Sequence, residues 1–249
     1  MTELAQLLRF AAPVAYAAIG ESVGQKAGVI NIGLEGMMLS ASFAAAMVAV
    51  KSGSWALGLV AGVLVGLVLA ICQGIFVVGL AVDQVIAGTA LNLIALGATN
   101  AAFRSTYGQS GSLVSAPTMG AAGGFDALMA LLPVAALLAS WAIYRTPWGL
   151  AARAAGSNPE AAAAAGLSVR RLRYQALAVG GLCAGLAGSY LALGINGSFA
   201  ENMTAGRGFM AIAVVTFGRW KPIWAVLASL LIGYAESLQF TFQAKGLAV

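Results

Sequence analysis

Several apolar runs in this sequence reach the roughly 18 to 20 residues that a helix needs to cross a bilayer. Hydrophobic residues make up 61% of the 249 positions, and charged residues make up only 8%. Soluble domains carry about 25% charged residues, so a water-soluble fold is not expected. The sequence therefore predicts an all-α, polytopic membrane helix bundle that forms one transmembrane domain over residues 1–249.

About eight spans are predicted, separated by short polar segments. They cover Leu7–Gly20, residues 28 to about 50, Trp55–Leu80, Val85–Phe103, Ala127–Ile143, Tyr174–Ile195, Phe209–Gly218 and Ile223–Phe242. The seventh of these runs is only half as long as a bilayer requires, which indicates a half-helix. The longest loop, 104–126, separates the fourth and fifth spans. Gly58, Gly62 and Gly66 place small residues on one face of the third span, where another helix can approach closely.

Polar residues interrupt the apolar pattern most clearly in the stretch 28–39, which carries Asn31 and Glu35 at positions that should face lipid. A bare carboxylate in hydrocarbon costs roughly several kcal/mol, so an acid within a membrane span indicates a functional site. Three glycines in this stretch loosen the helix, and membrane proteins build sites at membrane depth from interrupted helices. We therefore expect an interrupted helix near the N-terminus. The alternative is a glycine-weakened helix whose Glu35 pairs with a neighbouring helix.

A second informative segment is the loop 146–173, which together with Arg145 carries five arginines against a single acid. By the positive-inside rule, this loop is cytoplasmic. It also contains the signals of a complete short helix, with Asn158 as the N-cap, Pro159 at the first helical position, an alanine run, and Gly166 at the C-terminus. An isolated helix this short is marginal in water, so either the membrane face of its own protein or a partner must hold it.

The residue types that catalysis and metal binding require are scarce. The sequence has no histidine, and no group of cysteines or carboxylates has the spacing of a metal site, so neither a metal nor another cofactor is expected. No Gly-x-x-x-x-Gly-Lys-Ser/Thr loop is present, so the chain is not expected to hydrolyse ATP itself. The net charge of +5 comes from basic residues in short loops, where they set the membrane topology and do not indicate nucleic-acid binding.

Three segments resemble the permease subunits of bacterial ABC importers, in the group that includes branched-chain amino-acid, ribose-type sugar and nucleoside uptake systems. They are residues 28–38 with Asn-Ile-Gly-Leu-Glu-Gly, residues 155–166 with Gly-Ser-Asn-Pro-Glu, and residues 208–222 with Gly-Arg-Trp-Lys-Pro. The chain looks most like the shorter permease of nucleoside importers of the guanosine or purine type. Family members generally continue beyond the equivalent of Gln243, so the chain is expected to lack the family's last C-terminal helices.

The resemblance implies that the short loop helix is a coupling helix, which fits a groove of a cytoplasmic ATPase. It places this role on Gly156, Asn158, Pro159, Glu160, Ala163 and Gly166. It further implies three partners, namely a second permease subunit, a cytoplasmic ABC ATPase and an extracytoplasmic substrate-binding protein. The implied location is the bacterial cytoplasmic (inner) membrane, crossed several times.

The leading hypothesis is a translocation subunit for a small polar solute, with a nucleoside as the expected cargo. The polar groups assigned to its path are Asn31, Glu35, Gln84, Asn92 and Asn100. One acid among four amides suits a neutral, hydrogen-bonding solute better than an anion. Asn92 shares a helix face with Thr99, and such a polar stripe faces either a partner helix or a wet cavity. A permease for ribose-type sugars, and an ion-coupled carrier that uses Glu35 or Glu236, are the alternatives.

Overall fold

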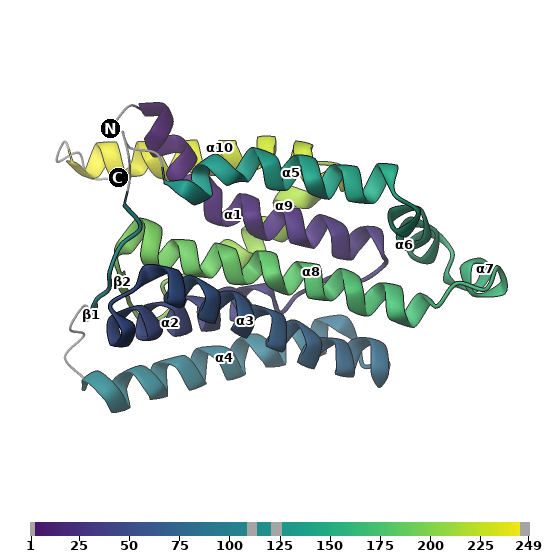
Figure 1. Cartoon of the computed structure of the whole chain (residues 1–249), viewed down its shortest axis with the longest axis horizontal. Helices are drawn as coiled ribbons and strands as arrows, with labels where there is room; N and C mark the ends of the chain where they lie inside the picture. The colour runs from purple at the N-terminus through teal and green to yellow at the C-terminus, as the bar shows by residue number, and fades with distance from the viewer. Residues whose placement is uncertain (1–2, 109–113, 121–125, 245–249) are drawn as a thin grey trace.

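The computed structural model describes residues 3–108, 114–120 and 126–244, and over these residues the chain forms a bundle of helices with one short pair of strands (Figure 1). The elements in chain order are α1 (Glu3–Lys26), α2 (Leu34–Ser52), α3 (Trp55–Gly74), α4 (Gln84–Tyr107), β1 (Val114–Ser115), α5 (Ala127–Arg145), α6 (Pro147–Ser157), α7 (Pro159–Ala164), α8 (Val169–Tyr190), β2 (Ser198–Phe199), α9 (Arg207–Phe217) and α10 (Pro222–Ala244). Short π-helical segments, Ile75–Gly79 and Leu191–Asn196, extend α3 and α8. The two strands pair antiparallel and fasten the segment after α4 to the segment after α8.

The all-α membrane bundle is confirmed, but eight full spans are not. Five helices in the described part of the chain are long and apolar enough to cross a membrane, namely Leu34–Ser52, Trp55–Gly79, Gln84–Tyr107, Ala127–Arg145 and Val169–Asn196. The predicted first, seventh and eighth spans fall in α1, α9 and α10, which are outside this set. α9 has 11 residues and is therefore about 16 Å long. That is about half of the roughly 30 Å of a hydrocarbon core.

The connection between α1 and α2 runs inside the bundle. α1 ends at Lys26, and Gly28, with a φ of +81°, turns the chain. In Figure 1 the connection returns from the right-hand end of the bundle toward its middle, where α2 begins at Leu34. Ile32 in this connection packs so closely on Gly88 of α4 that no side chain would fit there. The interrupted helix expected near the N-terminus is not confirmed in that form, because the non-helical stretch joins two separate helices.

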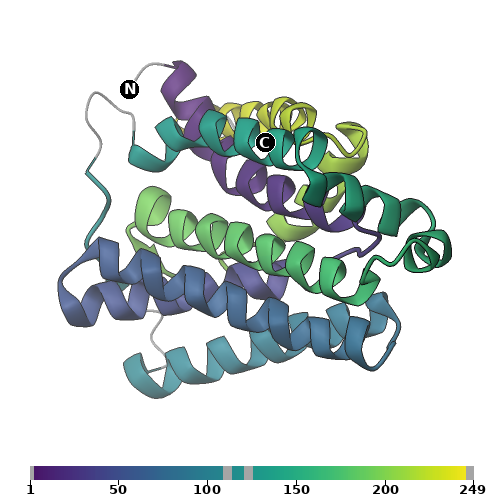
Figure 2. The same cartoon turned by 45° about the vertical axis from the view of Figure 1, so that its right-hand side comes forward.

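α8 is the central helix of the bundle and packs against α1, α2 and α3, between which it lies in Figures 1 and 2. A Cβ atom on Gly185 of α8 would lie 2.6 Å from the Cα of Val63 of α3. The predicted row of Gly58, Gly62 and Gly66 is buried on α3. On the α2 side, the hydroxyl of Ser42 donates a hydrogen bond of 2.8 Å to the carbonyl of Gly188. In lipid, where apolar surface alone does not drive helices together, close backbone approach supplies the van der Waals contact that holds them.

Replacing Gly185 with Val should therefore destabilise the bundle, because the added side chain meets the backbone of α3. Overpacking of this kind costs about 1–3 kcal/mol. Gly97→Val on α4 is the matched control, since nothing lies within 4 Å of a Cβ at that position. We expect the midpoint of thermal unfolding in detergent to fall for Gly185→Val and to stay near the wild-type value for Gly97→Val. Equal midpoints for the two variants would contradict the packing described above.

Candidate functional site

The half-length helix α9 begins against the carboxylate of Glu35. The backbone N–H of Gly206 donates to Oε1 of Glu35 at 2.8 Å, and the N–H of Gly208 donates to Oε2 at 2.6 Å. Glu35 is only 9% exposed. A Cβ on Gly208 would lie 2.6 Å from the Cα of Glu35, so glycine at this position lets α9 approach α2. One carboxylate thus satisfies two of the backbone donors that a helix start leaves without a partner.

Glu35 also lies in the first turn of its own helix, α2, so two helix N-termini meet at this carboxylate. The positive ends of both helix dipoles and two charge-assisted hydrogen bonds stabilise its negative charge. This arrangement explains how Glu35 can be held among apolar helices although it forms no ion pair with any described residue. The sequence left open whether Glu35 pairs with a neighbouring helix, and in the structure it does hydrogen-bond to the start of α9.

The second acid of the predicted spans, Glu236 on α10, is ion-paired. Its Oε2 lies 3.2 Å from Nη2 of Arg207, and the two side chains are 16% and 18% exposed. Nη1 of Arg207 also donates to the carbonyl of Met203 at 3.2 Å. Arg207 therefore neutralises Glu236 and ties α10 to the loop before α9.

A cavity of about 450 Å³ opens beside Glu35, between α2, α4 and the start of α9. The polar groups in its wall belong to Glu35, Thr89, Asn92 and Asn202, and Phe209 adds an aromatic face that is 47% exposed. The rest of the wall is mostly leucine and glycine. A largely apolar cavity with a few convergent polar groups is the common form of a small-molecule site.

Asn92 joins α4 to the start of α2 at the edge of this cavity. Its Nδ2 donates to the carbonyl of Ile32 at 2.8 Å, and its Oδ1 accepts from the N–H of Gly36 at 2.8 Å. An amide has two N–H donors and two acceptor lone pairs, so half of its hydrogen-bonding capacity is still open to a ligand.

The five predicted path residues do not all come together. Glu35 and Asn92 line the cavity, whereas the buried Asn31 makes its hydrogen bonds elsewhere, with its backbone N–H donating to Oε1 of Glu21 at 3.1 Å. Oε1 of Gln84 accepts from the N–H of Ile30 at 2.7 Å and so fixes the connection before α2. Asn100 is half-buried, and its Oδ1 has no hydrogen-bond partner among the described groups.

The sequence did not predict Asn202 and Phe209 as residues of the cavity. They flank the N-terminus of α9, in the loop and first turn that bring this helix to Glu35. The half-length apolar run was the available signal, because a helix of that length must start within the depth of the bundle.

The short loop helix is present as α7, and its ends are formed as expected. The Oδ1 of Asn158 accepts from the N–H of Ala161 at 3.0 Å, Pro159 is the first helical residue, and Gly166 has a φ of +83°. Ala162 is buried against Leu172 at the start of α8, which anchors one face of α7. The opposite face, with Glu160 and Ala163, is exposed.

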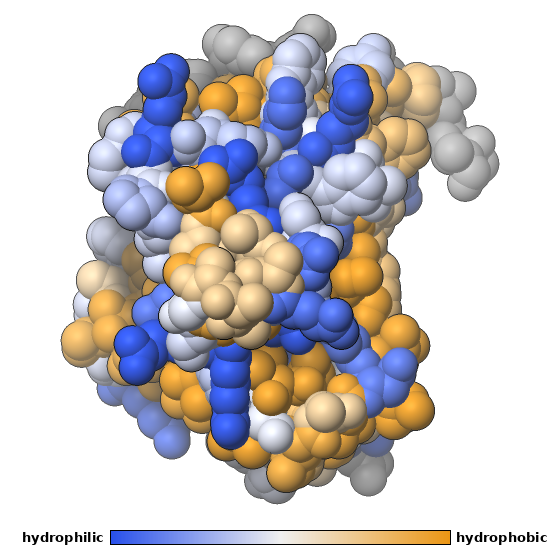
Figure 3. Space-filling view, turned by 90° about the vertical axis from the view of Figure 1, so that its right-hand side faces the viewer, coloured by the Kyte–Doolittle hydropathy of each residue, from blue (hydrophilic) through white to orange (hydrophobic). Residues whose placement is uncertain are grey.

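α7 projects from one end of the bundle, and the separate helix α6 precedes it (Figure 1). Seen from this end, an apolar protrusion stands in a ring of hydrophilic residues (Figure 3). Gly156 of α6 lies directly on the connection between α1 and α2, since a Cβ there would come 2.9 Å from the nitrogen of Gly28. Of the six residues assigned to coupling, Gly156 therefore contacts the bundle. Pro159, Glu160 and Ala163 belong to α7, and Asn158 and Gly166 flank it.

Comparison with known proteins places these features in context. Residues 3–246 match the family model described as "Branched-chain amino acid transport system / permease component". The chain is 32% identical to the guanosine ABC transporter permease protein NupQ of Bacillus subtilis, over 93% of this chain and 79% of the relative. It is 29% identical to the nucleoside ABC transporter permease protein NupC of Lactococcus lactis, over 94% and 81%. It is 33% identical to the putative glucose ABC transporter permease protein TsgC13 of Haloferax volcanii, over 94% and 75%. No solved structure matches the chain.

Replacing Glu35 with Gln should destabilise the protein, because the amide keeps one acceptor oxygen and turns an NH₂ group toward the other backbone donor. A buried donor without a partner costs about 1–3 kcal/mol. We expect the unfolding midpoint of Glu35→Gln in detergent to fall accordingly.

Glu201→Gln is the matched control. Arg104 hydrogen-bonds to Glu201 at 2.7 Å in an exposed pair, and this bond lowers the pKa of the Glu201 carboxyl. An exposed ion pair contributes little to stability, so this variant should unfold near the wild-type midpoint. A Glu35→Gln variant as stable as Glu201→Gln would show that α9 does not depend on the carboxylate.

Proposed function

This chain belongs to the family of permease components of branched-chain amino acid transport systems, and we propose that its cargo is a nucleoside. As an ABC importer permease it is a membrane transport subunit and not an enzyme, and its family works with an ATPase and a substrate-binding protein. The relatives above carry nucleoside, guanosine and glucose names, so similarity alone leaves the solute open. The cavity beside Glu35 supports the choice.

The observation that carries this proposal is an exposed aromatic ring facing the same cavity as two amides. Phe209 offers a flat apolar surface on which a nucleobase can stack, and Asn92 and Asn202 offer donors and acceptors for its edge or for the ribose. A sugar carries hydroxyl groups all round its ring. Against the leucine-rich wall many of them would lose their hydrogen bonds to water without replacement, which is costly.

The charge state of the cavity supports a neutral solute. Both oxygens of Glu35 already accept backbone hydrogen bonds, and Glu236 is paired with Arg207. Both acids thus have partners that serve a structural role, which favours an ABC permease over an ion-coupled carrier, the alternative from a different class. Within the proposed path, Glu35 and Asn92 line the cavity. Asn31 and Gln84 hold the connection that leads to it, and Asn100 lies farther along α4.

We assign energy coupling to the loop 146–173, through the exposed face of α7. The chain contains no phosphate-binding loop of the ATPase type, so the free energy of ATP hydrolysis has to reach it through a contact. α7 is too short to be stable alone, and only one of its faces is held by its own protein. The free face, with Glu160 and the small side chain of Ala163, fits a groove on the ATPase.

A contiguous set of contacts leads from this helix to the cavity. α7 follows α6, α6 lies on Gly28 through Gly156, and the connection from Gly28 leads to Glu35 and the start of α9. A shift of α7 could therefore change the position of Glu35 relative to α9 and open or close the path by a small rigid-body motion. Spatial contact supports this route, and a measured coupling between the sites would test it.

The proposed location is the bacterial cytoplasmic membrane, with α7 on the inner side. The basic residues of the loop 146–173 favour this orientation under the positive-inside rule. The full assembly would hold a second permease subunit beside this one.

Phe209→Ala should weaken nucleoside transport, because it removes the stacking surface. Base stacking on an aromatic side chain contributes about 1–3 kcal/mol, so we expect the KM for guanosine uptake to rise roughly tenfold. Uptake would be measured in proteoliposomes with the ATPase and binding protein, and Phe209→Trp serves as the control that keeps the stacking surface. Excess unlabelled nucleoside should compete with labelled guanosine, and excess glucose or ribose should not. Competition by the sugars alone would reassign the cargo.

Ala163→Arg should uncouple transport from ATP hydrolysis without unfolding the protein, because it adds a long side chain to the exposed face of α7. We expect ATP-dependent uptake to fall more than tenfold and co-purification with the ATPase to be lost. Ser52→Arg, exposed at the opposite end of the bundle, is the matched control and should transport normally. Normal uptake by Ala163→Arg would remove α7 from the coupling mechanism.

A further inference from the structure

A groove runs between α9 and α10 on the outside of the bundle. Its first part is a cavity of about 560 Å³ whose lining includes Phe217, Arg219, Lys221, Trp224 and Leu231. A second hollow of about 200 Å³ shares Phe217 and Leu231 with the first and continues between the same two helices. The two hollows form one channel along the helix pair.

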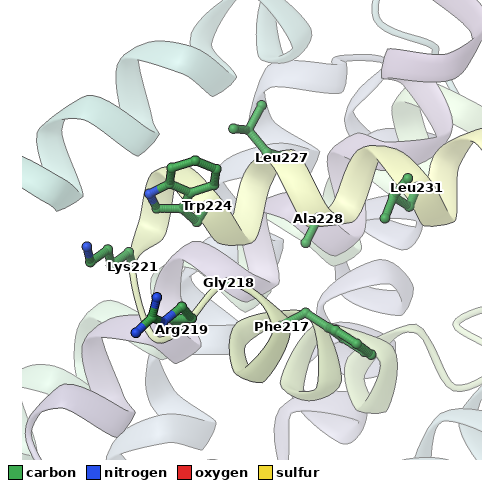
Figure 4. A pocket seen from close by; sticks show the side chains of 8 residues that line it. All are labelled: Phe217, Gly218, Arg219, Lys221, Trp224, Leu227, Ala228 and Leu231. Atoms are coloured by element: carbon green, nitrogen blue, oxygen red, sulfur yellow. The ribbon is translucent and has the colours of Figure 1, made fainter.

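This groove is basic at one end and apolar along the rest of its length. Figure 4 shows Arg219 and Lys221 at one end, with Phe217 on α9 and Leu231 on α10 farther along. Phe217 is 82% exposed and Leu231 is 74% exposed, so the described part of the chain leaves both side chains uncovered. Such a long apolar surface in a membrane protein has to be covered by lipid or by another helix.

The cations at the end of the groove lack counter-charges. Arg219 and Lys221 form no ion pair with any acid of the described residues, where the pairs are Arg104–Glu201 and Arg207–Glu236. No acidic side chain lines either hollow within the described chain. An anion bound between the two cations would reduce their mutual repulsion.

The basic end lies at the same end of the bundle as the coupling loop. Nε1 of Trp220 donates to Oε1 of Gln25 at 2.7 Å, and Nζ of Lys26 lies 6.0 Å from the centre of the Trp220 ring. Arg219 and Trp220 have positive φ values of 52° and 57°, so this turn is held in a conformation that L-residues seldom adopt. With the coupling loop inside, the two cations face the leaflet that carries anionic lipids.

We propose that this groove binds one anionic phospholipid, with its phosphate between Arg219 and Lys221 and an acyl chain lying between α9 and α10. The basic end matches an anionic headgroup at the membrane interface, and the apolar channel matches the hydrocarbon chain joined to it. The chemistry that recognises the ligand is thus a phosphate covalently attached to an alkyl chain.

A second copy of this chain fits the charges less well. A second copy packed symmetrically through this groove would bring two further cations to the same place, because the same patch forms both sides of such an interface.

The proposal can be tested on the purified full chain in detergent, without a transport assay, so its failure is separable from failure of the assigned cargo. We expect phosphatidylglycerol to raise the thermal unfolding midpoint, and phosphatidylcholine to raise it much less. Lys221→Gln and Arg219→Gln should each weaken the apparent affinity for phosphatidylglycerol about fivefold, the usual effect of one basic residue at an anionic surface. Lys51→Gln, which removes one exposed charge at the other end of the bundle, should keep the wild-type affinity.

The apolar part of the site needs its own variant. Leu231→Trp should fill the channel and abolish the response to phosphatidylglycerol while leaving both cations in place. Equal stabilisation by the two lipids, or an unchanged preference in both charge variants, would overturn the proposal. Full stabilisation by inorganic phosphate alone would also overturn it, in favour of a free-anion site. Disulfide-linked dimers of Leu231→Cys in membranes would overturn it in favour of a protein interface.

Discussion

The hydrogen bonds from the start of α9 to Glu35 are the interaction on which this structure depends most. A helix that begins within the depth of a membrane exposes backbone N–H groups where no water can satisfy them. Glu35 accepts from two of these groups, and the same groups stabilise its charge. A buried carboxylate and buried backbone N–H groups are each costly without a partner. The hydrogen bonds between Glu35 and the start of α9 satisfy both.

Close packing of small residues fixes the position of α9 against Glu35. The Cα of Gly208 lies against the backbone of Glu35, and α8 approaches α2 and α3 through its own glycines. Because these helices meet backbone to backbone, few side-chain rotamers can absorb a shift between them. A displacement of one helix is therefore passed to its neighbours, which is the mechanical property that an ATP-driven permease requires.

The connection between α1 and α2 links the two parts of the proposed mechanism, the coupling helix α7 and the cavity beside Glu35. At one end Gly28 lies against α6, and at the other Glu35 lies against α9. Gln84 of α4 accepts from the backbone N–H of Ile30 between these points, and Asn92 of α4 donates to the carbonyl of Ile32. Side-chain amides thus replace the helical hydrogen bonds of this stretch, which is how irregular backbone is tolerated among apolar helices.

The sequence by itself determined the membrane class, the small-residue face of α3 and both ends of the α7 helix. These features follow from local patterns, namely apolar run length, glycine spacing and capping residues such as Asn158. It could not determine whether the stretch 28–33 is a break in one helix or a link between two, because glycine permits both conformations. The partner of Glu35 lies 171 positions away at Gly206, and only the tertiary structure brought them together. The same holds for the cavity, where Asn202 and Phe209 lie beside Asn92. The backbone N–H of Asn31 instead donates to Glu21, and Oε1 of Gln84 accepts from the backbone N–H of Ile30. Which side chains line the cavity depends on how the helices pack and not on residue type alone.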